Sequence, residues 1–535
     1  MEWFTRIRNF FCSVEKRINE LRCKITKCFR LFGKKSSHKE DEHDDYNKIL
    51  EKVTKKGKLF KDKQFPATEK SLKHSGDVDA KIKWLRPHEI CDDPEFIVDG
   101  HDRFDCKQGE LGDCWLLAAV ANLTLHEDLF RKVVPSDQSF KNNYAGVFRF
   151  SFWRFGKWVD IVVDDRLPTK NGHLIYMHSS NKNEFWSALL EKAFAKLHDS
   201  YENLRGGSAC EAMQDFTGGI TEWYDLRDNA NMMAHFKIML KAYEKKSMMC
   251  CSIIVDDDSQ LESETEDGLI RGHAYSITKV ALIDIQTPNK TGKIPMIRLR
   301  NPWGNDVEWH GQWSDQSPEW QFIPENVKKE IGLNFDHDGE FWMSLQDFYH
   351  NFDLLDICHL TPDWLIEEPN DGDDDEDDVD RFIWETSLAE GKWIQNVTAG
   401  GCRNFLKTFW RNPQFKVTLV DPDDEDDDDT CSVLIALMQK NRRAQKHLGV
   451  QFLTIGFSIY SLDEADLAFR KQPLEFFKYK ASICRSSFVN LREVTGRFKL
   501  LPGDYLIVPS TYDPNEEAEF LIRVYTEKKN IMNKC

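Results

Sequence analysis

The sequence predicts an α+β protein with a helix-rich region, a strand-rich region and an antiparallel β-sandwich, in that order. After Cys114 the chain is apolar nearly all round, which is typical of a buried helix. Between Cys251 and Arg300 the apolar runs favour strands. From Phe382 onward, short alternating strands recur between turn signals and no long helical pattern appears, which predicts a sandwich. A chain of 535 residues has room for about three domains.

Composition and charge disfavour several classes of function. The formal net charge of -18 argues against nucleic acid as a partner, because an acidic surface repels phosphate. The 14 cysteines show no regular framework, so free thiols in a reducing cytoplasm are expected. No apolar run approaches the roughly 20 residues that a membrane-spanning helix needs. These features predict a cytoplasmic protein.

Residues 1–36 form a predicted basic amphipathic helix. They contain ten Lys or Arg and three Glu, a net charge of +7. Apolar residues recur at spacings of three and four, as on one helical face: Ile7, Phe11, Val14, Ile18, Leu21, Ile25, Cys28 and Phe32. Three interpretations stay open: a helix on an anionic membrane surface, a short coiled coil that binds a partner, and a helix that docks on the rest of this chain. We favour the helix on a membrane surface, which predicts that the cytoplasmic protein also lies at the periphery of membranes.

The stretch from Gln108 to Leu117 carries a candidate nucleophile. Asp113 is suited to cap the helix that begins at Cys114, and Gly112 allows a tight entry turn. The positive end of the helix dipole favours a thiolate at Cys114, so a lowered pKa is expected. Gln108 offers an amide donor for an oxyanion, beside the backbone N–H of Cys114. This combination predicts a reactive cysteine rather than an inert buried one.

A base and an orienting group follow downstream. His273 opens a strand-rich run, and Asn301 ends another, because Pro302 cannot continue the strand. A cysteine, a histidine roughly 150 residues further on and an asparagine soon after is the order of papain-like proteases. The three residues therefore predict a thiol–imidazole pair with an amide that orients the imidazole.

Other elements can be placed from periodicity and turn residues. Helical periodicity marks residues 184–197. The pairs Gly206-Gly207 and Gly218-Gly219 mark loops. Strands are predicted over residues 251–255, 274–285, 294–300, 414–420, 431–438, 452–460, 505–508 and 519–525.

Long ordered motifs resemble the calpain family of cytosolic cysteine proteases. In the first two regions these motifs are QGELGDCWLLAA, NEFWSALLEKAFAK, GHAYSITK, RLRNPWG, EWHGQWSD and DGEFWMSLQDF. Later motifs resemble the β-sandwich that follows the protease in calpains: GGCRNFLKTFWRNPQFKVTL, CSVLIALMQKNRR and LPGDYLIVPSTYDPNEEAEFLIRVYTEK. The resemblance covers roughly residues 85–528.

This resemblance implies a papain-like two-lobe cysteine protease core followed by the antiparallel β-sandwich. Lobe 1 at residues 81–212 would carry the nucleophile, lobe 2 at 213–362 the histidine and asparagine, and residues 381–528 would form the sandwich. The implied roles are Cys114 as nucleophile, His273 as base, Asn301 as the residue that orients it, Gln108 as oxyanion donor and Trp303 as a gate beside the active site.

The resemblance also implies two calcium sites in the protease core. Hard carboxylate and carbonyl oxygens suit this cation. The first site would use Val98, Gly100, Asp105 and Glu184, and the second Glu308, Asp315, Asp336, Asp338 and Glu340. Asp336 departs from many relatives, in which an apolar residue at this position offers only its carbonyl. Its carboxylate either adds a ligand or points outward.

Four segments are predicted to lie outside the domain cores. Residues 37–80 are polar and charge-mixed, which predicts a linker with one segment that packs on the protease. Residues 363–380 are an acidic linker, and residues 529–535 are a tail. The acidic run 421–429 lies in a sandwich loop that binds calcium, pairs with basic residues of the protease or is simply solvated. No EF-hand motif is present, so we expect no EF-hand small subunit as partner.

Three functions are consistent with the motifs to different degrees. The first is a calcium-dependent intracellular cysteine endopeptidase that makes limited cleavages in protein substrates, with its triad assembled by calcium-driven closure of the lobes. The second is a membrane-attached, non-catalytic calpain-like scaffold, which does not need the intact Cys114, His273 and Asn301. The third is a transglutaminase-like acyl transferase, which Asn301 disfavours because such enzymes use aspartate there. We favour the endopeptidase.

Overall fold

The computed structural model describes residues 46–535 apart from 75, 77, 228–230, 256, 287–290, 306, 316, 337, 361–383, 421–429 and 529. The chain divides into two units, Met1–His43 and Asp44–Cys535. The amphipathic helix predicted for residues 1–36 and the acidic runs at 363–380 and 421–429 lie outside the described residues.

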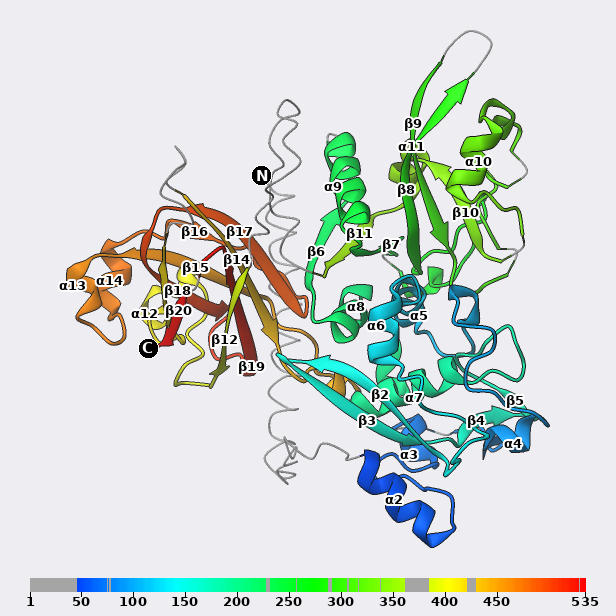
Figure 1. Cartoon of the computed structure of the whole chain (residues 1–535). Helices are drawn as coiled ribbons and strands as arrows, with labels where there is room; N and C mark the ends of the chain where they lie inside the picture. Colours follow the sequence, from blue (N-terminus) through cyan, green and yellow to red (C-terminus); the bar gives the residue numbers. More distant parts are fainter. Residues whose placement is uncertain are drawn as a thin grey trace, which may run out of the picture. The chain divides into compact units, whose positions relative to one another are not determined.

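Residues 46–217 form a mostly helical part of the second unit (Figure 1). Its helices are α2 Tyr46–Lys56, α3 Glu69–Leu72, α4 Pro87–Ile90, α5 Cys114–Leu123, α6 Glu127–Val133, α7 Trp186–Leu197 and α8 Ala209–Thr217, with short 3-10 turns η1 Arg103–Asp105 and η2 Glu202–Leu204. A hairpin joins β2 Val147–Arg154 to β3 Lys157–Asp164, and a small sheet has the order β1 Ile82–Leu85, β4 Leu167–Lys170, β5 His173–Leu174. We call residues 46–217 the helical part.

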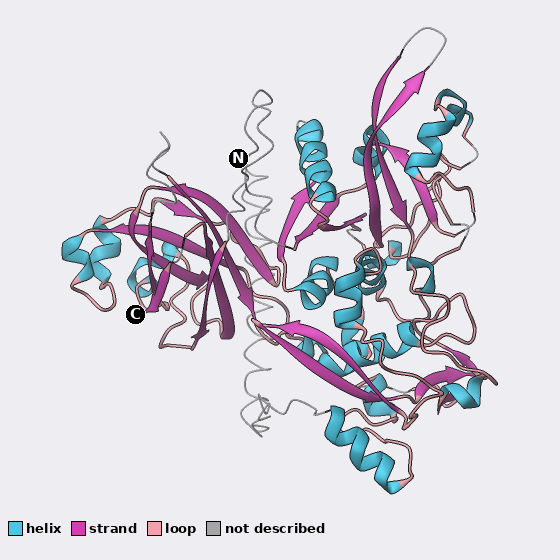
Figure 2. Ribbon diagram, viewed as in Figure 1, coloured by secondary structure: helices cyan, strands magenta, loops and turns pink. Residues whose placement is uncertain are grey.

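Residues 220–359 form an antiparallel sheet of six strands with helices packed against it, and we call them the sheet part (Figure 2). The strand order is β10 Glu340–Ser344, β9 Thr291–Arg300, β8 Ala274–Gln286, β7 Met248–Ser252, β11 Leu354–His359, β6 Ile220–Asp225. Apolar side chains of α9 Met232–Glu244 and α11 Leu345–Asn351 share a core with the strands, and α10 Glu325–Ile331 packs in a second, smaller core.

Residues 385–534 form two antiparallel sheets whose inner side chains share one core. The first sheet is β12 Glu385–Trp393, β19 Ala518–Thr526, β14 Cys431–Gln439, β17 Glu493–Leu500. The second is β16 Cys484–Arg485, β15 Ile455–Leu462, β18 Gly503–Thr511, β13 Phe415–Leu419, β20 Ile531–Lys534. Short helices α12 Leu406–Phe409, α13 Glu464–Leu467 and α14 Leu474–Tyr479 and the turn η8 Arg443–Leu448 lie in the connections. We call this region the sandwich.

The mixed α+β character and most predicted elements are confirmed. Helix α5 begins at Cys114, and its other nine residues are buried, as its all-round apolar pattern predicts. Helix α7 ends at Leu197 as predicted but begins two residues late, at Trp186. All described cysteines are free thiols, as expected. Among the described residues, no helix is both long enough and apolar enough to cross a bilayer.

Two predicted boundaries and the bounds of one strand were wrong. Residues 37–80, predicted as a linker with one packing segment, include the helix α2, whose Tyr46 packs with Ala145 and Val147. The boundary placed between residues 212 and 213 falls inside α8, because this helix packs on α5 and ends only at Thr217. The tail at 529–535 contains β20, which pairs with β13 through backbone hydrogen bonds that a tail sequence does not reveal. The strand predicted at 251–255 is β7 Met248–Ser252.

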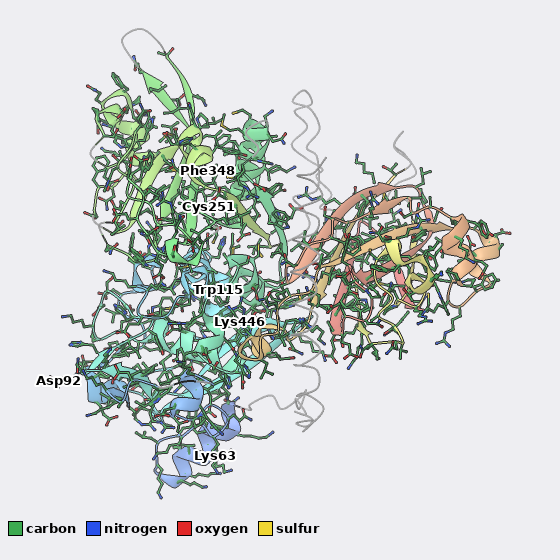
Figure 3. All side chains as sticks on the ribbon, turned by 180° about the vertical axis from the view of Figure 1, so that it is seen from behind. Lys63, Asp92, Trp115, Cys251, Phe348 and Lys446 are labelled. Atoms are coloured by element: carbon green, nitrogen blue, oxygen red, sulfur yellow. The ribbon has the colours of Figure 1, made fainter. Side chains whose placement is uncertain are left out.

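The sandwich is joined to the helical part by buried ion pairs. Arg443 of η8 donates to both carboxylate oxygens of Glu211, at 2.9 and 2.6 Å. Arg492 donates to Asp215 at 2.6 Å. The guanidinium of Arg443 also lies 4.3 Å from the ring centre of Trp115, the residue after Cys114. Figure 3 labels Trp115 and Lys446, which mark the two sides of this contact.

Candidate active site and carboxylate clusters

A cleft of about 570 Å³ brings together the predicted nucleophile and base. Its first wall is the chain from Gly109 to Cys114 in the helical part. Its second wall comes from the sheet part, with Ser252–Val255 and Gly272–Ala274. Cys114 and His273 thus line one cavity, although they are 159 positions apart in the sequence.

The pKa expected for Cys114 is corrected by the structure. The thiol is half-buried at the first turn of α5, where the helix dipole and the N–H groups of Ala274 and Trp115 favour a thiolate. Burial outweighs them and raises the pKa of Cys114 to about 12, with a smaller contribution from the neighbouring Asp113 carboxylate. At neutral pH this residue is therefore a thiol in the arrangement seen here.

Asp113 does not cap α5 as predicted. It occupies the N-cap position, but its side chain accepts no capping hydrogen bond and is fully buried. Burial raises the pKa of Asp113 to about 7, and burial together with the Asp113 carboxylate raises that of Glu191 on α7. Glu191 accepts a hydrogen bond from the backbone of Met177 at 3.1 Å. Asp113, the neighbour of Cys114, and Glu191 thus form a buried carboxyl pair that retains protons which exposed carboxylates lose.

The glycine that the entry loop requires is Gly109 rather than Gly112. A Cβ atom at Gly109 would lie 2.3 Å from the carbonyl oxygen of Ile175, since the neighbouring Glu110 N–H donates to that oxygen. At Gly112 a Cβ atom would meet no atom of the described residues within 4 Å. The loop is thus shaped by close approach to residue 175 and not by a tight turn at residue 112.

His273 and Asn301 meet at the ends of two paired strands. His273 immediately precedes β8, and Asn301 immediately follows β9. Nε2 of His273 lies 2.9 Å from Oδ1 of Asn301. Burial lowers the pKa of His273 to about 4, so the ring is neutral at neutral pH. Among the described residues Nδ1 of His273 is buried without a hydrogen-bond partner, which leaves it as the nitrogen able to accept a proton.

Asn301 is held by its surroundings on all sides. Its backbone N–H donates to the Gly339 carbonyl at 2.8 Å, and its side-chain amide donates to the Val307 carbonyl at 3.0 Å. Its Oδ1 also accepts from the Trp303 backbone at 3.1 Å. The Trp303 ring lies 5.2 Å from the His273 ring, centre to centre. Trp303 is therefore beside the imidazole, as expected from the motif.

Gln108 lies at the start of the first wall. Its Nε2 donates to the Leu111 carbonyl at 2.9 Å, which uses one of the two amide hydrogens. Its backbone N–H donates to the Pro302 carbonyl at 3.2 Å, across to the sheet part. The side chain is thus oriented by the loop that leads to Cys114, with one hydrogen left for another acceptor.

The first carboxylate cluster gathers around Glu184. Its two oxygens accept from the backbone of Val98 and the hydroxyl of Ser179, both at 2.7 Å. Asp105 lies close enough to influence its titration. Burial, together with the Asp105 charge, raises the pKa of Glu184 to about 7, and burial also raises that of Asp105. Gly100 has φ +101°, a left-handed geometry that suits glycine and turns the loop back on itself.

The second carboxylate cluster surrounds the loop before β10. Burial and the charges of Glu308, Asp338, Glu340 and Asp336 raise the pKa of Asp315 to about 7. Glu308 is buried, and its Oε1 accepts from the Gly339 backbone at 2.8 Å. Asp336 is exposed, so its side chain points outward. The structure therefore brings all five predicted acids of this site into one neighbourhood.

Arg103 lies on the same 3-10 turn as Asp105 of the first cluster and pairs with Glu340 of the second. Its Nε and Nη2 donate to the two oxygens of Glu340 at 2.8 and 2.9 Å, a bidentate pair between the helical and sheet parts. Burial opposes ionisation of Glu340, but Arg103 and Arg298 outweigh it and lower the pKa of Glu340. A second contact lies nearby, where Arg300 donates to the Cys106 carbonyl at 3.2 Å.

Sequence reasoning missed three residues that shape the site, namely Arg103, Glu191 and Arg443. The sequence held a signal for Glu191 only, since a glutamate on the apolar helix 184–197 calls for a buried partner. Arg103 and Arg443 contact residues 237 and 232 positions away, so no local pattern points to them.

Comparison with known proteins identifies the family. Residues 60–359 match the family model described as calpain family cysteine protease, and residues 389–525 match calpain large subunit, domain III. The chain belongs to the calpain family. It is 60% identical to Calpain-A of Drosophila melanogaster over 509 residues, which cover 95% of this chain and 60% of that protein. It is 60% identical to Calpain-B of the same organism over 489 residues, 91% of this chain and 52% of that protein.

Mammalian calpains are more distant. The Calpain-1 catalytic subunit of Rattus norvegicus is 47% identical over 497 residues, 91% of this chain and 67% of that protein. The chain thus spans a little over half the length of the fly relatives. The helical and sheet parts together are the calpain protease domain, and the sandwich is calpain domain III.

Proposed function

We propose that this calpain is a calcium-dependent cysteine endopeptidase that makes limited cleavages in protein substrates, with its helical and sheet parts acting as two papain-like lobes. One observation carries the proposal. The His273–Asn301 hydrogen bond leaves Nδ1 of the imidazole unpartnered among the described residues, in the cleft that also holds Cys114. This arrangement supports a base that takes the thiol proton when a substrate enters.

In the proposed reaction Nδ1 of His273 removes the proton of Cys114, and the thiolate attacks the carbonyl carbon of the scissile peptide. The backbone N–H of Cys114 and the remaining amide hydrogen of Gln108 hold the oxyanion. His273 then donates its proton to the leaving amine, which leaves a thioester on Cys114. A water deprotonated by His273 hydrolyses the thioester and restores the thiol.

The high pKa of Cys114 and the low pKa of His273 describe a resting pair that is neutral on both residues. Proton transfer from Cys114 to His273 is therefore unfavourable until a substrate is bound and the two lobes have closed. Asn301 assists the transfer, because a hydrogen bond from Nε2–H to its Oδ1 stabilises the imidazolium. This gives the asparagine a role in charge stabilisation as well as in orientation.

The two carboxylate clusters fit calcium. Each gathers hard oxygen donors, and burial together with neighbouring acids raises the pKa of Glu184 and of Asp315. We propose Val98, Gly100, Asp105 and Glu184 for the first site and Glu308, Asp315, Asp338 and Glu340 for the second, where Asp336, whose side chain points outward, would offer its backbone carbonyl. Bound calcium would stabilise the ionised forms of Glu184 and Asp315, whose pKa values are raised.

A short path leads from the second cluster to the triad. Glu308 accepts from the N–H of Gly339, and the carbonyl of Gly339 accepts from the N–H of Asn301. A Cβ atom at Gly339 would lie 2.8 Å from the Asn301 carbonyl oxygen, so the two loops are in direct contact. Fixing Glu308 therefore fixes the loop that positions Asn301 and, through it, His273.

Peptide hydrolysis in buffered calcium tests the proposal. The full chain should cleave a fluorogenic peptide with calcium, and Cys114→Ala should show no turnover although it remains folded. Turnover by Cys114→Ala would refute the assignment. A folded chain that binds peptide and calcium without cleavage would favour the scaffold.

We also propose a cellular location for this protein and a membrane surface as its partner. We place the protein in the cytoplasm, with residues 1–36 on an anionic membrane surface because of their net charge of +7. Co-sedimentation with phosphatidylserine vesicles should fall as salt rises and be lost when residues 1–36 are removed. Equal sedimentation of both chains would reject membrane binding by this segment.

A further inference from the structure

Two histidines and an aspartate that do not line the cleft meet at the junction of three chain segments. His74 follows α3, Asp199 follows α7 and His447 lies on η8 of the sandwich. Nε2 of His74 lies 3.2 Å from Oδ2 of Asp199. The His74 and His447 rings are stacked with centres 3.6 Å apart and planes 15° apart. One ligand atom from each of the three lies within 4.8 Å of the others.

The surrounding backbone holds these side chains in place. Glu202 of η2 accepts from the backbone N–H of His74 at 2.8 Å. The next residue, Asn203, accepts from the backbone N–H of His447 at 3.2 Å through its Oδ1. Asp199 has φ +80°, a left-handed conformation that directs its side chain away from the helix it follows. The turn η2 thus locates both imidazoles from adjacent residues.

The stacked rings are suited to share one cation. Nε2 of His74 faces the Asp199 carboxylate at hydrogen-bonding distance, so a bound cation would take the place of the hydrogen between them, beside the stacked His447 ring. Asp199 supplies the negative charge that a cation bound by neutral imidazoles requires.

We propose that His74, Asp199 and His447 bind a transition-metal ion of the zinc class. Two imidazole nitrogens and one carboxylate oxygen form a set typical of zinc with one position open to water. Zinc ligands at about 2.0–2.2 Å lie about 3.3 Å from one another in a tetrahedron, so rotations of the exposed His74 and Asp199 side chains suffice to close the set. Calcium prefers oxygen donors, so this site differs in kind from the carboxylate clusters.

The position of the site gives it a structural role. It links the segment before β1, the helical part and the sandwich, next to the Arg443–Glu211 ion pair and the contact of Lys446 with the Gly206 carbonyl at 2.9 Å. An ion bound only in the folded state raises the folded population by a factor of 1 + [ion]/Kd, which is about 100-fold at 100 times Kd. The metal would thus strengthen the attachment of the sandwich to the protease domain. This inference does not depend on peptidase activity.

Cobalt absorption of the full chain tests the site directly. Cobalt(II) is added to a Cys114→Ser chain in excess calcium, so that neither the cleft thiol nor the carboxylate clusters compete. Binding at His74, Asp199 and His447 should produce visible d–d bands of tetrahedral type without thiolate-to-cobalt charge transfer in the near ultraviolet. Zinc should abolish these bands at one equivalent and raise the Tm, and a chelator should reverse both effects.

Matched variants distinguish this site from adventitious binding. His447→Ala, His74→Gln and Asp199→Asn should each weaken cobalt binding at least tenfold and remove the zinc-dependent rise in Tm. His350→Ala, which removes an exposed histidine on α11, should bind as the parent does. If His447→Ala fails to fold, the exposed Asp199→Asn and His74→Gln decide the question. Unchanged binding in these variants, or bands with thiolate charge transfer, would overturn the proposal.

Discussion

The cleft wall that carries Cys114 is a helix whose other nine residues are buried, whereas the wall that carries His273 and Asn301 is a pair of loops held by polar contacts. The first wall is set by packing, and Arg443 of the sandwich supports it from behind through Trp115. The second wall is set by hydrogen bonds that run through Gly339 to the Glu308 carboxylate.

This difference suggests where regulation can act. A buried helix moves only if its core repacks, so Cys114 is the fixed point of the cleft. Loops held by carboxylates change conformation when a cation binds, because the cation reduces the repulsion between those carboxylates. We therefore expect changes behind the helical wall to alter stability and changes in the second cluster to alter the calcium requirement and turnover.

The largest effect is expected from removing the support behind the helical wall. Arg443→Met leaves the buried Glu211 carboxylate without its bidentate partner and should destabilise the fold by about 3–5 kcal/mol. The measurement is the urea midpoint, followed by tryptophan fluorescence. As a control, the exposed Arg470→Met should leave the urea midpoint unchanged. If Arg443→Met also has the midpoint of the parent chain, the sandwich does not support this wall.

On the cleft side of the same wall, Gln108→Ala should lower kcat about 100- to 1000-fold, equivalent to about 2.7–4 kcal/mol, by removing one oxyanion donor. Its Tm should change little, because packing of α5 and not the Gln108 side chain holds the wall. Gln395→Ala, which alters an exposed glutamine of the sandwich, serves as control. A kcat within threefold of the parent would exclude Gln108 as a donor.

The buried carboxyls beneath Cys114 predict a pH-dependent stability. Because the pKa of Asp113 is raised from 3.8 to about 7 and that of Glu191 is also raised, the folded state binds more protons than the unfolded state. The contribution of these groups to the free energy of unfolding is thus greatest below pH 4 and is lost as the pH rises through 7. The loss is up to about 1.4 kcal/mol per pH unit for each group.

Glu191→Gln removes one of these groups without changing its size. Its Tm should exceed that of the parent at pH 8 and approach it at pH 5, as followed by thermal unfolding across this range. Asp284→Asn, at an exposed position on β8, should parallel the parent at every pH. If Tm changes with pH equally in Glu191→Gln and in the parent, the folded state binds no more protons at this pair than the unfolded state does.

The smallest effect is expected from substituting one acid in each carboxylate cluster. Glu184→Ala and Glu308→Ala should each raise the calcium needed for half-maximal activity by about tenfold, equivalent to about 1.4 kcal/mol, by removing a carboxylate ligand. Only Glu308→Ala should also lower kcat at saturating calcium, because it releases Gly339 and loosens Asn301. Glu308→Gln keeps the hydrogen bond to Gly339 and should affect calcium alone.

Buffered calcium titrations of the peptidase rate measure both quantities. Equal kcat for Glu308→Ala and Glu184→Ala at saturating calcium would contradict the path through Gly339. Loss of kcat in Glu308→Gln to the extent seen in Glu308→Ala would show that the charge, and not the hydrogen bond, positions Asn301.

The sequence by itself determined the elements whose signals are local. An apolar run begins a buried helix at Cys114, and strand patterns with Pro302 place His273 and Asn301 at strand ends. Long motifs identified the family, which the comparisons confirm. These features follow from periodicity, turn chemistry and residue order, which need no knowledge of distant contacts.

Tertiary structure alone decided what each group faces. The sequence predicted a lowered pKa for Cys114 from the helix dipole, but burial reverses it, and burial depends on how the whole core closes. The same holds for the Arg103–Glu340 pair and for the meeting of His74, Asp199 and His447, whose partners lie more than 100 positions apart. Charge and metal chemistry depend on distances in space, which a local pattern does not contain.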